Sequence, residues 1–365
     1  MDFAFNEEQE ELRATARAFL ADHSGPEQIR AAMESDLGHD PQVWKQIAAE
    51  LGWAAVTIPE EYGGLGLGAV ELTALLEVMG ESLLCSPFFA TVCLGANALI
   101  VAGSEEQKQE HLPRIAEGEI IATLAHRGAS DAIEVTARTD GGEIVLSGRA
   151  DFVVDGHAAD LLIVAAHDGE DVALFCVAGD AAGLVRTLHT TLDQTRRLAS
   201  LELQDVRVPA SARLTGDGGL DEILDRAVVA LAAEQVGGAQ RCLDLAVAYM
   251  KEREQFGRPI GSFQALKHKA ANMMIELESA RSAAYYAACV AAEGSDELPS
   301  VASLAKAYCS DTFFQCAADC LQIHGGVGFT WEYDVHLYFK RARSSEVLLG
   351  DPAFHRERVA RLIGL

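Results

Sequence analysis

Apolar residues recur at helical spacing in the first third of the chain. The first helix is predicted to begin at Asn6, which with Gln9 three positions on has the pattern of a capping box. Its apolar face is made by Leu12, Ala16, Phe19 and Leu20. Further helices are expected after the capping residues Asp40 and Ser104. These patterns predict a helical N-terminal domain over residues 1–118.

The period of the pattern changes near residue 120. Two apolar stretches, 135–146 and 161–177, are each interrupted by a glycine-containing turn and each predicts a β-hairpin. A further strand region is expected within 187–208. Short strands with turns at this spacing predict a compact middle β domain over residues 119–215.

Three long alanine-rich stretches follow the boundary at Asp217-Gly218-Gly219. They cover 221–252, 262–293 and 299–323, and each is longer than an ordinary globular helix. Such helices bury their apolar faces against one another, which predicts a four-helix bundle over residues 216–365 with surface left for partner subunits. The predicted fold class is therefore α+β, mostly α, with a helical domain, a β domain and a helical bundle in that order.

The charge balance limits the partners. The chain has 365 residues with 29 Lys and Arg against 55 Asp and Glu, a formal charge of −26. Such a surface repels nucleic acid and anionic membranes. An anionic ligand such as a dinucleotide or coenzyme A must therefore be held by local donors. No uncharged apolar run reaches the length of a spanning helix, and the acidic start lacks a secretory signal, so a soluble cytoplasmic protein is expected.

The eight cysteines do not predict a metal site. They form no Cys-x-x-Cys pair. Cys316, Cys320 and His324 follow one another at one-turn spacing, but no second pair with ligand spacing lies nearby. Buried reduced thiols are the better interpretation, and no metal is expected.

Two C-terminal motifs have the chemistry of a dinucleotide site. Residues 253–264 read Arg-Glu-Gln-Phe-Gly-Arg-Pro-Ile-Gly-Ser-Phe-Gln, and residues 322–329 read Gln-Ile-His-Gly-Gly-Val-Gly-Phe. A cation for phosphate, an aromatic wall, amide donors and bare backbone are groups that can hold the phosphates and base of a nucleotide. They come from Arg253, Phe256, Gln264, Gln322, Gly325 and Gly326. Taken singly, the arginine could be a solvated helix end and the glycines a helix stop.

These motifs closely resemble the RxxFGxxxxxxQ and QIxGGxGF elements of acyl-CoA dehydrogenases. The loop 59–64 and the stretch 105–113 also look like that family, so the likeness covers nearly the whole chain. The resemblance implies FAD as cofactor, an acyl-CoA substrate, α,β-dehydrogenation and an acceptor like electron-transfer flavoprotein. It also implies an oligomer, because in the family both motifs serve the FAD of a neighbouring subunit.

The flavin-ring side departs from the family pattern. A TEPGAGSD-like loop is replaced by residues 124–131, and a WITNG-like strand by residues 152–156. The two threonine positions that would hydrogen-bond the flavin are Leu124 and Val154. Ser130 is retained as a further cofactor candidate, and Phe152 stands where the family has tryptophan.

The catalytic glutamate is also missing from both places where the family keeps it. Counted without gaps, these places are Leu349 and Ala227. Removal of an α proton needs a buried carboxylate, so the base is either absent or relocated. The relocation candidates are Glu234, Glu346 and Asp351, with Glu234 the most notable because its surroundings are apolar.

The sequence therefore favours a subunit that lends nucleotide-side contacts to a homologous, glutamate-bearing partner. It looks like the smaller chains of actinobacterial α2β2 dehydrogenases that act on steroid side-chain CoA thioesters. Two alternatives stay open. One is a self-sufficient homotetrameric dehydrogenase with a relocated base, and the other is a non-catalytic scaffold of the same fold.

Overall fold

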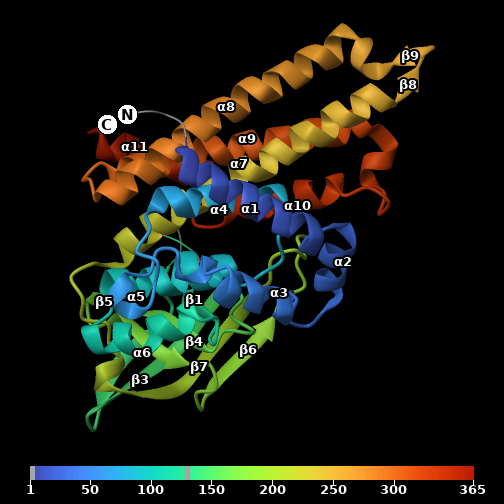
Figure 1. Ribbon diagram of the computed structural model, residues 1–365. Coiled ribbons are helices and arrows are strands. Elements are labelled where there is room, and N and C mark those ends of the chain that lie inside the picture. The colour runs from blue at the N-terminus through green and yellow to red at the C-terminus, as the bar shows by residue number, and fades with distance from the viewer. Residues whose placement is uncertain (1–4, 127, 129–131) are drawn as a thin grey trace. The chain divides into compact units, whose positions relative to one another are not determined.

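The structure is a computed structural model that describes residues 5–126, 128 and 132–365 (Figure 1). The described chain forms two compact units, each discontinuous in sequence. Unit 1 contains residues up to Arg30, Ala69–Leu84 and Val228–Leu365, and unit 2 contains Ala31–Gly68 and Cys85–Ala227. The three-part division made from the sequence stays a prediction. The fold class is confirmed: the chain is mostly helical, with one mixed β sheet.

Unit 1 is helical. It holds α1 (Glu7–His23), α4 (Ala69–Glu81), most of α7 (Leu220–Glu252), α8 (Gln264–Glu293), α9 (Leu298–His324), α10 (Val335–Val347) and α11 (Pro352–Leu362). The predicted capping box is present, since the Asn6 side chain accepts from the Gln9 backbone N–H at 2.9 Å. The three long helices match their predicted stretches to within a few residues. The local helical period was therefore sufficient to find them.

Helices α4 and α7 of unit 1 cross at very short range because both carry glycine at the crossing. A Cβ atom at Gly237 would lie 1.8 Å from the carbonyl oxygen of Glu77, and one at Gly80 would lie 2.0 Å from that of Glu234. No side chain fits at either position.

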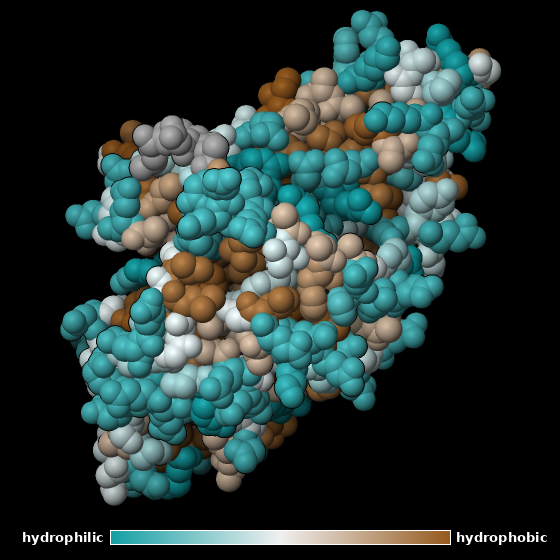
Figure 2. Space-filling model, in the orientation of Figure 1, coloured by the Kyte–Doolittle hydropathy of each residue, from teal (hydrophilic) through white to brown (hydrophobic). Residues whose placement is uncertain are grey.

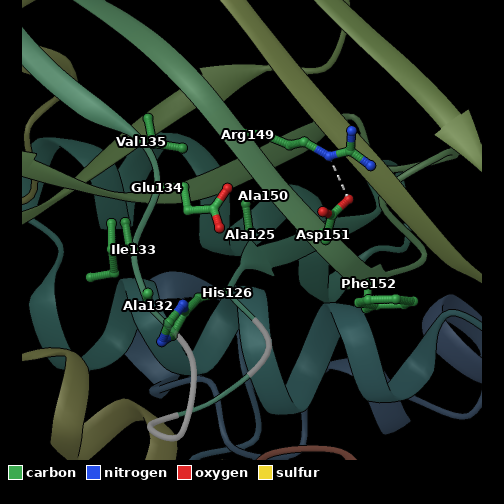
Figure 3. A pocket seen from close by; sticks show the side chains of 11 residues that line it. Ala125, His126, Ala132, Ile133, Glu134, Val135, Arg149, Ala150, Asp151 and Phe152 are labelled. Carbon is green, nitrogen blue, oxygen red and sulfur yellow. Dashed lines mark hydrogen bonds and ion pairs between the residues drawn. The ribbon is translucent and has the colours of Figure 1, made fainter.

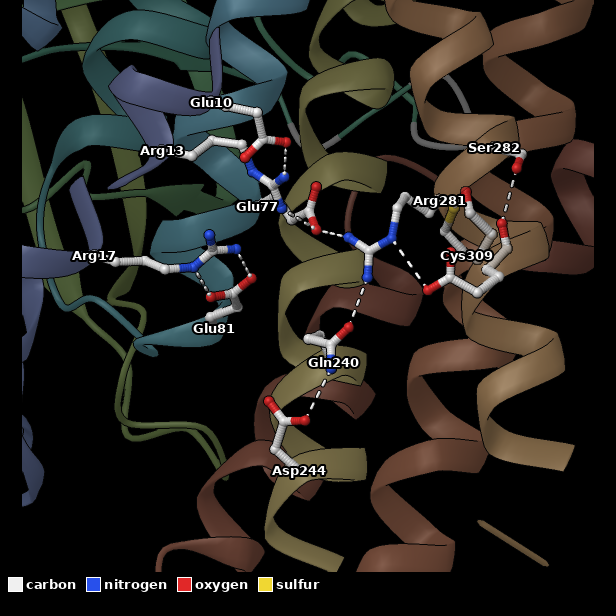
Figure 4. A network of polar contacts seen from close by, with 12 residues as sticks. Glu10, Arg13, Arg17, Glu77, Glu81, Gln240, Asp244, Arg281, Ser282 and Cys309 are labelled. Atoms are coloured by element: carbon white, nitrogen blue, oxygen red, sulfur yellow. Dashed lines mark hydrogen bonds and ion pairs between the residues drawn. The ribbon is translucent and has the colours of Figure 1, made fainter. Parts of the chain in front are cut away.

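A buried polar network joins α1, α4, α7 and α8 (Figure 4). The Glu77 carboxylate is almost fully buried and pairs with the guanidiniums of both Arg13 and Arg281. Arg281 also donates to the side chain of Gln240 at 2.7 Å. Burial, together with the nearby Arg13 and Arg17, lowers the pKa of Arg281 to about 10. The network thus offsets the cost of buried charge by pairing each member.

Unit 2 contains the sheet and shorter helices. The helices are α2 (Pro26–Glu34, in part), α3 (Pro41–Lys45), α5 (Asn97–Ala102) and α6 (Glu105–Ala116), with an irregular helix η4 (Phe89–Ala96). The strands are β1 (Ala122–Ala125), β2 (Thr136–Asp140), β3 (Glu143–Val154), β4 (Leu161–Asp168), β5 (Asp171–Ala178), β6 (Leu184–Leu188) and β7 (Leu198–Pro209).

The sheet order is β1-β4-β2-β3-β7-β6, with β5 paired to β4. Both predicted hairpins are confirmed: β2 and β3 turn between Asp140 and Glu143, and β4 and β5 between Asp168 and Asp171. The parallel pairing of β1 with β4 was not predicted, because it joins residues far apart in the sequence. Alternate residues fill one apolar core that includes Leu146, Phe175 and Leu201.

None of the described helices combines the length and apolar character that a bilayer crossing needs. All eight cysteines are free. Within the described residues, no group of three or more His, Cys, Asp and Glu side chains could hold a metal ion. The surface on the face shown in Figure 2 is mostly hydrophilic, as the acidic composition requires, with apolar groups between the charged ones.

Candidate functional site

The two C-terminal motifs meet at one end of the long helices of unit 1 (Figure 1). Arg253 directly follows α7, the short hairpin β8–β9 (Glu254–Gln255 and Arg258–Pro259) comes next, and Gln264 begins α8. Gln322 lies in the last turn of α9, and Gly325 opens the 3-10 turn η7 (Gly325–Phe329). Because α7, α8 and α9 run antiparallel in succession, the end of α7, the start of α8 and the end of α9 lie together.

The predicted nucleotide-side residues are all exposed. They are Arg253, Phe256, Gln264, Gln322, Gly325 and Gly326. The Phe256 side chain is 92 % exposed and meets the Phe263 ring edge-on, at 6.1 Å between centroids. The ring is therefore accessible to a ligand or a partner.

The backbone at this end is open to a ligand. A Cβ atom built at Gly257, Gly325 or Gly326 would meet nothing within 4 Å. Gly325 has φ +62°, a left-handed conformation that glycine adopts without strain. The Gly325 N–H itself donates to the carbonyls of Leu321 and Gln322 in the cap of α9. An accessible guanidinium, an aromatic wall and glycine backbone that a ligand can approach closely therefore fit the phosphates and adenosine of a flavin dinucleotide.

The ring side is closed by contrast. Leu124 on β1 and Val154 at the end of β3 are both buried, and the Thr123 hydroxyl donates to the Val154 carbonyl at 2.7 Å. This bond fastens the two strands to each other. Neither apolar side chain can offer the hydrogen bonds that a flavin pyrimidine edge requires. Ser130, the remaining ring-side candidate, lies outside the described residues.

A cavity of about 210 Å³ lies beside these strands in unit 2 (Figure 3). Its lining includes the carboxylates of Glu134 and Asp151, and Asp151 pairs with Arg149 at 2.8 Å. Phe152 also lines it, but one face of its ring is stacked on His189, at 5.1 Å between centroids. Pockets for large organic ligands usually measure about 300–1,000 Å³. The cavity formed by the described residues is smaller than that.

The two places for the catalytic base hold buried apolar residues. Ala227 is fully buried in α7. Leu349 is 2 % exposed and has φ +60° in the turn between α10 and α11. Its carbonyl accepts a bond from His355 at 3.0 Å, and the next carbonyl, that of Gly350, accepts one from Lys306 at 3.1 Å. The turn is thus held from two sides, and residue 349 has no ionisable group.

Each proposed relocated base has a bonded partner. Glu234 pairs with Arg341 at 3.0 Å, and both side chains are buried. Glu346 pairs with Arg343 at 2.5 Å, and Asp351 caps α11 by accepting from the Phe354 N–H at 2.7 Å. Each carboxylate is thus engaged by another group: Glu234 by a buried guanidinium, Glu346 by an exposed one and Asp351 by a backbone N–H. These contacts favour structural roles for all three.

Two buried basic side chains have contacts that the sequence did not predict: Lys306, which was not singled out, and His324, which was considered only as a metal ligand. Lys306 is fully buried, and burial lowers its pKa to about 7. His324, inside the second motif, is buried and stacks on Tyr249 at the end of α7. The available signal was a lysine or histidine in an otherwise apolar helix face. That signal gives no partner, so it could not show what either residue contacts.

The chain belongs to the acyl-CoA dehydrogenase family. Residues 6–119 match the description "Acyl-CoA dehydrogenase, N-terminal domain", and residues 220–364 match "Acyl-CoA dehydrogenase, C-terminal domain". Among its relatives is an acyl-CoA dehydrogenase, IpdE2, of Mycolicibacterium smegmatis, 38 % identical over 98 % of both chains.

Two solved structures are similar over nearly their full length. One is a chain of the ChsE4–ChsE5 complex from Mycobacterium tuberculosis, with TM-score 0.93 and 29 % identity over all of both chains. The other is a chain of a Tcur3481–Tcur3483 steroid ACAD variant, with TM-score 0.91 and 33 % identity over 98 % of both chains. The chain is thus an oxidoreductase that acts on acyl-CoA, and FAD is its cofactor. FAD, when bound, accepts the hydride that leaves the acyl group.

Proposed function

We propose that this chain is the subunit of a heteromeric acyl-CoA dehydrogenase that lacks the catalytic base. The main support is the contrast between its nucleotide-side residues and the residues at the ring-side and base positions. The nucleotide-side residues at the end of α7 and α9 are exposed and accessible, whereas Leu124, Val154 and Leu349 are buried and apolar. This asymmetry is the observation that carries the proposal. The isoalloxazine and the catalytic glutamate then belong to a homologous partner in an α2β2 tetramer.

In this assembly the chain's own residues bind and orient. Arg253 donates to a phosphate, Phe256 covers the adenosine, and the absence of side chains at Gly325 and Gly326 lets the pyrophosphate approach the backbone closely. Gln264 and Gln322 supply amide groups at the same end. None of these groups moves a proton, which agrees with the absence of an ionisable side chain at Leu349 and Ala227.

The alternative of a self-sufficient homotetramer is weakened by the contacts of Glu234. Its carboxylate is committed to Arg341, so it would have to leave a buried ion pair to reach a substrate. The scaffold alternative leaves the exposed Phe256 and the open backbone at Gly325 and Gly326 without a purpose.

The proposed substrate class is a steroid side-chain CoA thioester, and the proposed acceptor is a protein like electron-transfer flavoprotein. Support for the substrate comes from the similar Tcur3481–Tcur3483 pair, which is described as a steroid ACAD. Support for a heteromer comes from the same pair and from the ChsE4–ChsE5 complex.

The test is Arg253→Ala in the complex of this chain with its glutamate-bearing partner, with Arg258→Ala as the matched control. Arg258 is also exposed, in the hairpin that follows Arg253, but its guanidinium lies over the Phe263 ring at 4.3 Å. We expect Arg253→Ala to weaken FAD binding at least tenfold and Arg258→Ala to change it less than threefold. Full FAD content in the Arg253→Ala complex would support the scaffold alternative and contradict the proposal.

A further inference from the structure

We infer that His324 is a positioning residue that joins the two halves of the nucleotide-side site through stacking on Tyr249. The inference rests on the function proposed above, because it concerns the same FAD contacts. It adds His324 and Tyr249, which are not among the six predicted nucleotide-side residues.

The stack connects the two helix ends that carry those contacts. His324 is the last residue of α9, directly before Gly325, and Tyr249 lies in the last turn of α7. Their ring centroids are 4.2 Å apart and the planes differ by 22°. The Tyr249 carbonyl accepts the backbone N–H of Arg253 at 2.9 Å. A single ring contact thus links the backbone that presents Arg253 to the backbone that presents Gly325.

A third aromatic ring closes the cluster. Tyr333, in the segment after η7, meets His324 edge-on at 5.8 Å and Tyr249 edge-on at 6.2 Å. The η7 turn also packs closely on His324, since a Cβ atom at Gly328 would lie 3.1 Å from the His324 Cβ. The η7 turn therefore packs against His324, which in turn contacts Tyr333.

The orientation of the His324 ring is fixed by a hydrogen bond. Its Nδ1 lies 2.8 Å from the carbonyl oxygen of Cys320, one turn earlier in α9. A carbonyl only accepts, so Nδ1 carries the proton. Burial lowers the pKa of His324, which keeps the ring neutral and able to stack near neutral pH. The groups that face it are the rings of Tyr249 and Tyr333 and the Cys320 thiol, whose pKa burial raises to about 12.

This arrangement gives the buried His324 ring a role beside the exposed nucleotide-side residues. A dinucleotide that contacts Arg253 and the Gly325 backbone together needs both at a fixed separation, since misplacement of either weakens binding. Aromatic pairs have a preferred geometry and so hold such a separation better than aliphatic packing does. Removal of the ring should then lower FAD affinity without removing any FAD contact.

The test compares three variants in the assembled complex with the partner subunit. His324→Ala removes the ring, His324→Phe keeps a stacking ring without the Cys320 bond, and His355→Ala is the matched control. His355 is also a buried neutral histidine bonded to a carbonyl, in α11. It packs near Lys306, about 27 Å along α9 from His324 at 1.5 Å per residue. The readouts are the FAD dissociation constant, the mass of the complex and the melting temperature without FAD.

We expect His324→Ala to weaken FAD binding about tenfold or more with the complex still assembled, and His324→Phe to stay within threefold of wild type. His355→Ala should lower the melting temperature at least as much, with unchanged FAD affinity. Tyr249→Ala should weaken binding like His324→Ala, and the double variant should add little, because both remove one contact.

Unchanged FAD affinity in His324→Ala, or equal losses in His324→Ala and His355→Ala, would overturn the inference. Arg253→Ala separates this failure from that of the proposed function. If Arg253→Ala releases FAD and His324→Ala does not, only the positioning role is wrong. If neither releases FAD, the nucleotide-side role itself is wrong.

Discussion

The buried carboxylate of Glu77 contributes to the stability of unit 1. Glu77 is shared by two guanidiniums, those of Arg13 and Arg281, and is almost fully buried. Glu77→Gln would leave both cations without their common carboxylate, and such losses cost about 3–5 kcal/mol. Glu81→Gln is the matched control on the same helix, because Glu81 pairs with the more exposed Arg17 at 2.9 Å. An exposed pair contributes about 0–1 kcal/mol. Urea unfolding of both variants measures the difference, and equal losses would contradict the assignment.

Buried histidines make the fold sensitive to acid. Burial lowers the pKa of His39, His111, His157, His324 and His336, and lowers that of His355 to about 4. Below about pH 6.5 these histidines bind protons more readily in the unfolded chain than in the folded chain. The free energy of unfolding therefore falls as the pH decreases.

For His355 this loss runs from about pH 6.5 down to about 4, at up to about 1.4 kcal/mol per pH unit. His355→Gln should therefore flatten the decline in melting temperature over that window. The same slope in the variant and the wild type would show that His355 does not contribute.

At the scale of elements, the close packing of helix α7 against helix α4 requires glycine at position 237. A methyl group at Gly237 would overlap the Glu77 carbonyl of α4. Gly237→Ala should force the two helices apart and destabilise the protein by about 1–3 kcal/mol or more. Gly219→Ala is the control, because a Cβ there meets nothing within 4 Å. Thermal unfolding compares the two, and a neutral Gly237→Ala would contradict the close crossing.

The elements themselves could be predicted where the signal is local. The capping box at Asn6, the two hairpins and the three long helices follow from spacing within a few residues. The β1–β4 pairing and the two discontinuous units could not be predicted, because they depend on contacts between distant segments. Glu234 shows the difference: the sequence marked it as unusual in an apolar run, but its partner Arg341 lies 107 residues later.

In the candidate site, too, local motifs could be recognised in the sequence, whereas contacts between distant segments could not. The nucleotide-side residues could be proposed from the sequence because they form two contiguous motifs, and the structure brings both motifs to one end of unit 1. The positioning role of His324 was not found, because its contact with Tyr249 depends on how α7 and α9 pack. The loss of polarity at Leu124, Val154 and Leu349 was visible in the sequence, but only the structure shows that these side chains are buried.

At the scale of the whole molecule, the exposed apolar residues of unit 1 indicate a partner. Phe256, Ile275 and Phe329 are each more than 60 % exposed, and apolar side chains reach the surface over the long helices in Figure 2. Aromatic residues of this kind are enriched at the centres of protein interfaces. Phe329→Ser should weaken association with the partner subunit, measured by analytical ultracentrifugation. Unit 2 offers a control in Val185→Ser, an exposed apolar residue of β6, which should leave association unchanged.

The most direct measurement is the flavin content and mass of the chain purified alone and purified with its partner. The account predicts a nearly colourless, inactive chain alone, and a yellow complex with one FAD for each pair of unlike chains. A lone chain that carries a full complement of FAD and oxidises an acyl-CoA would contradict it.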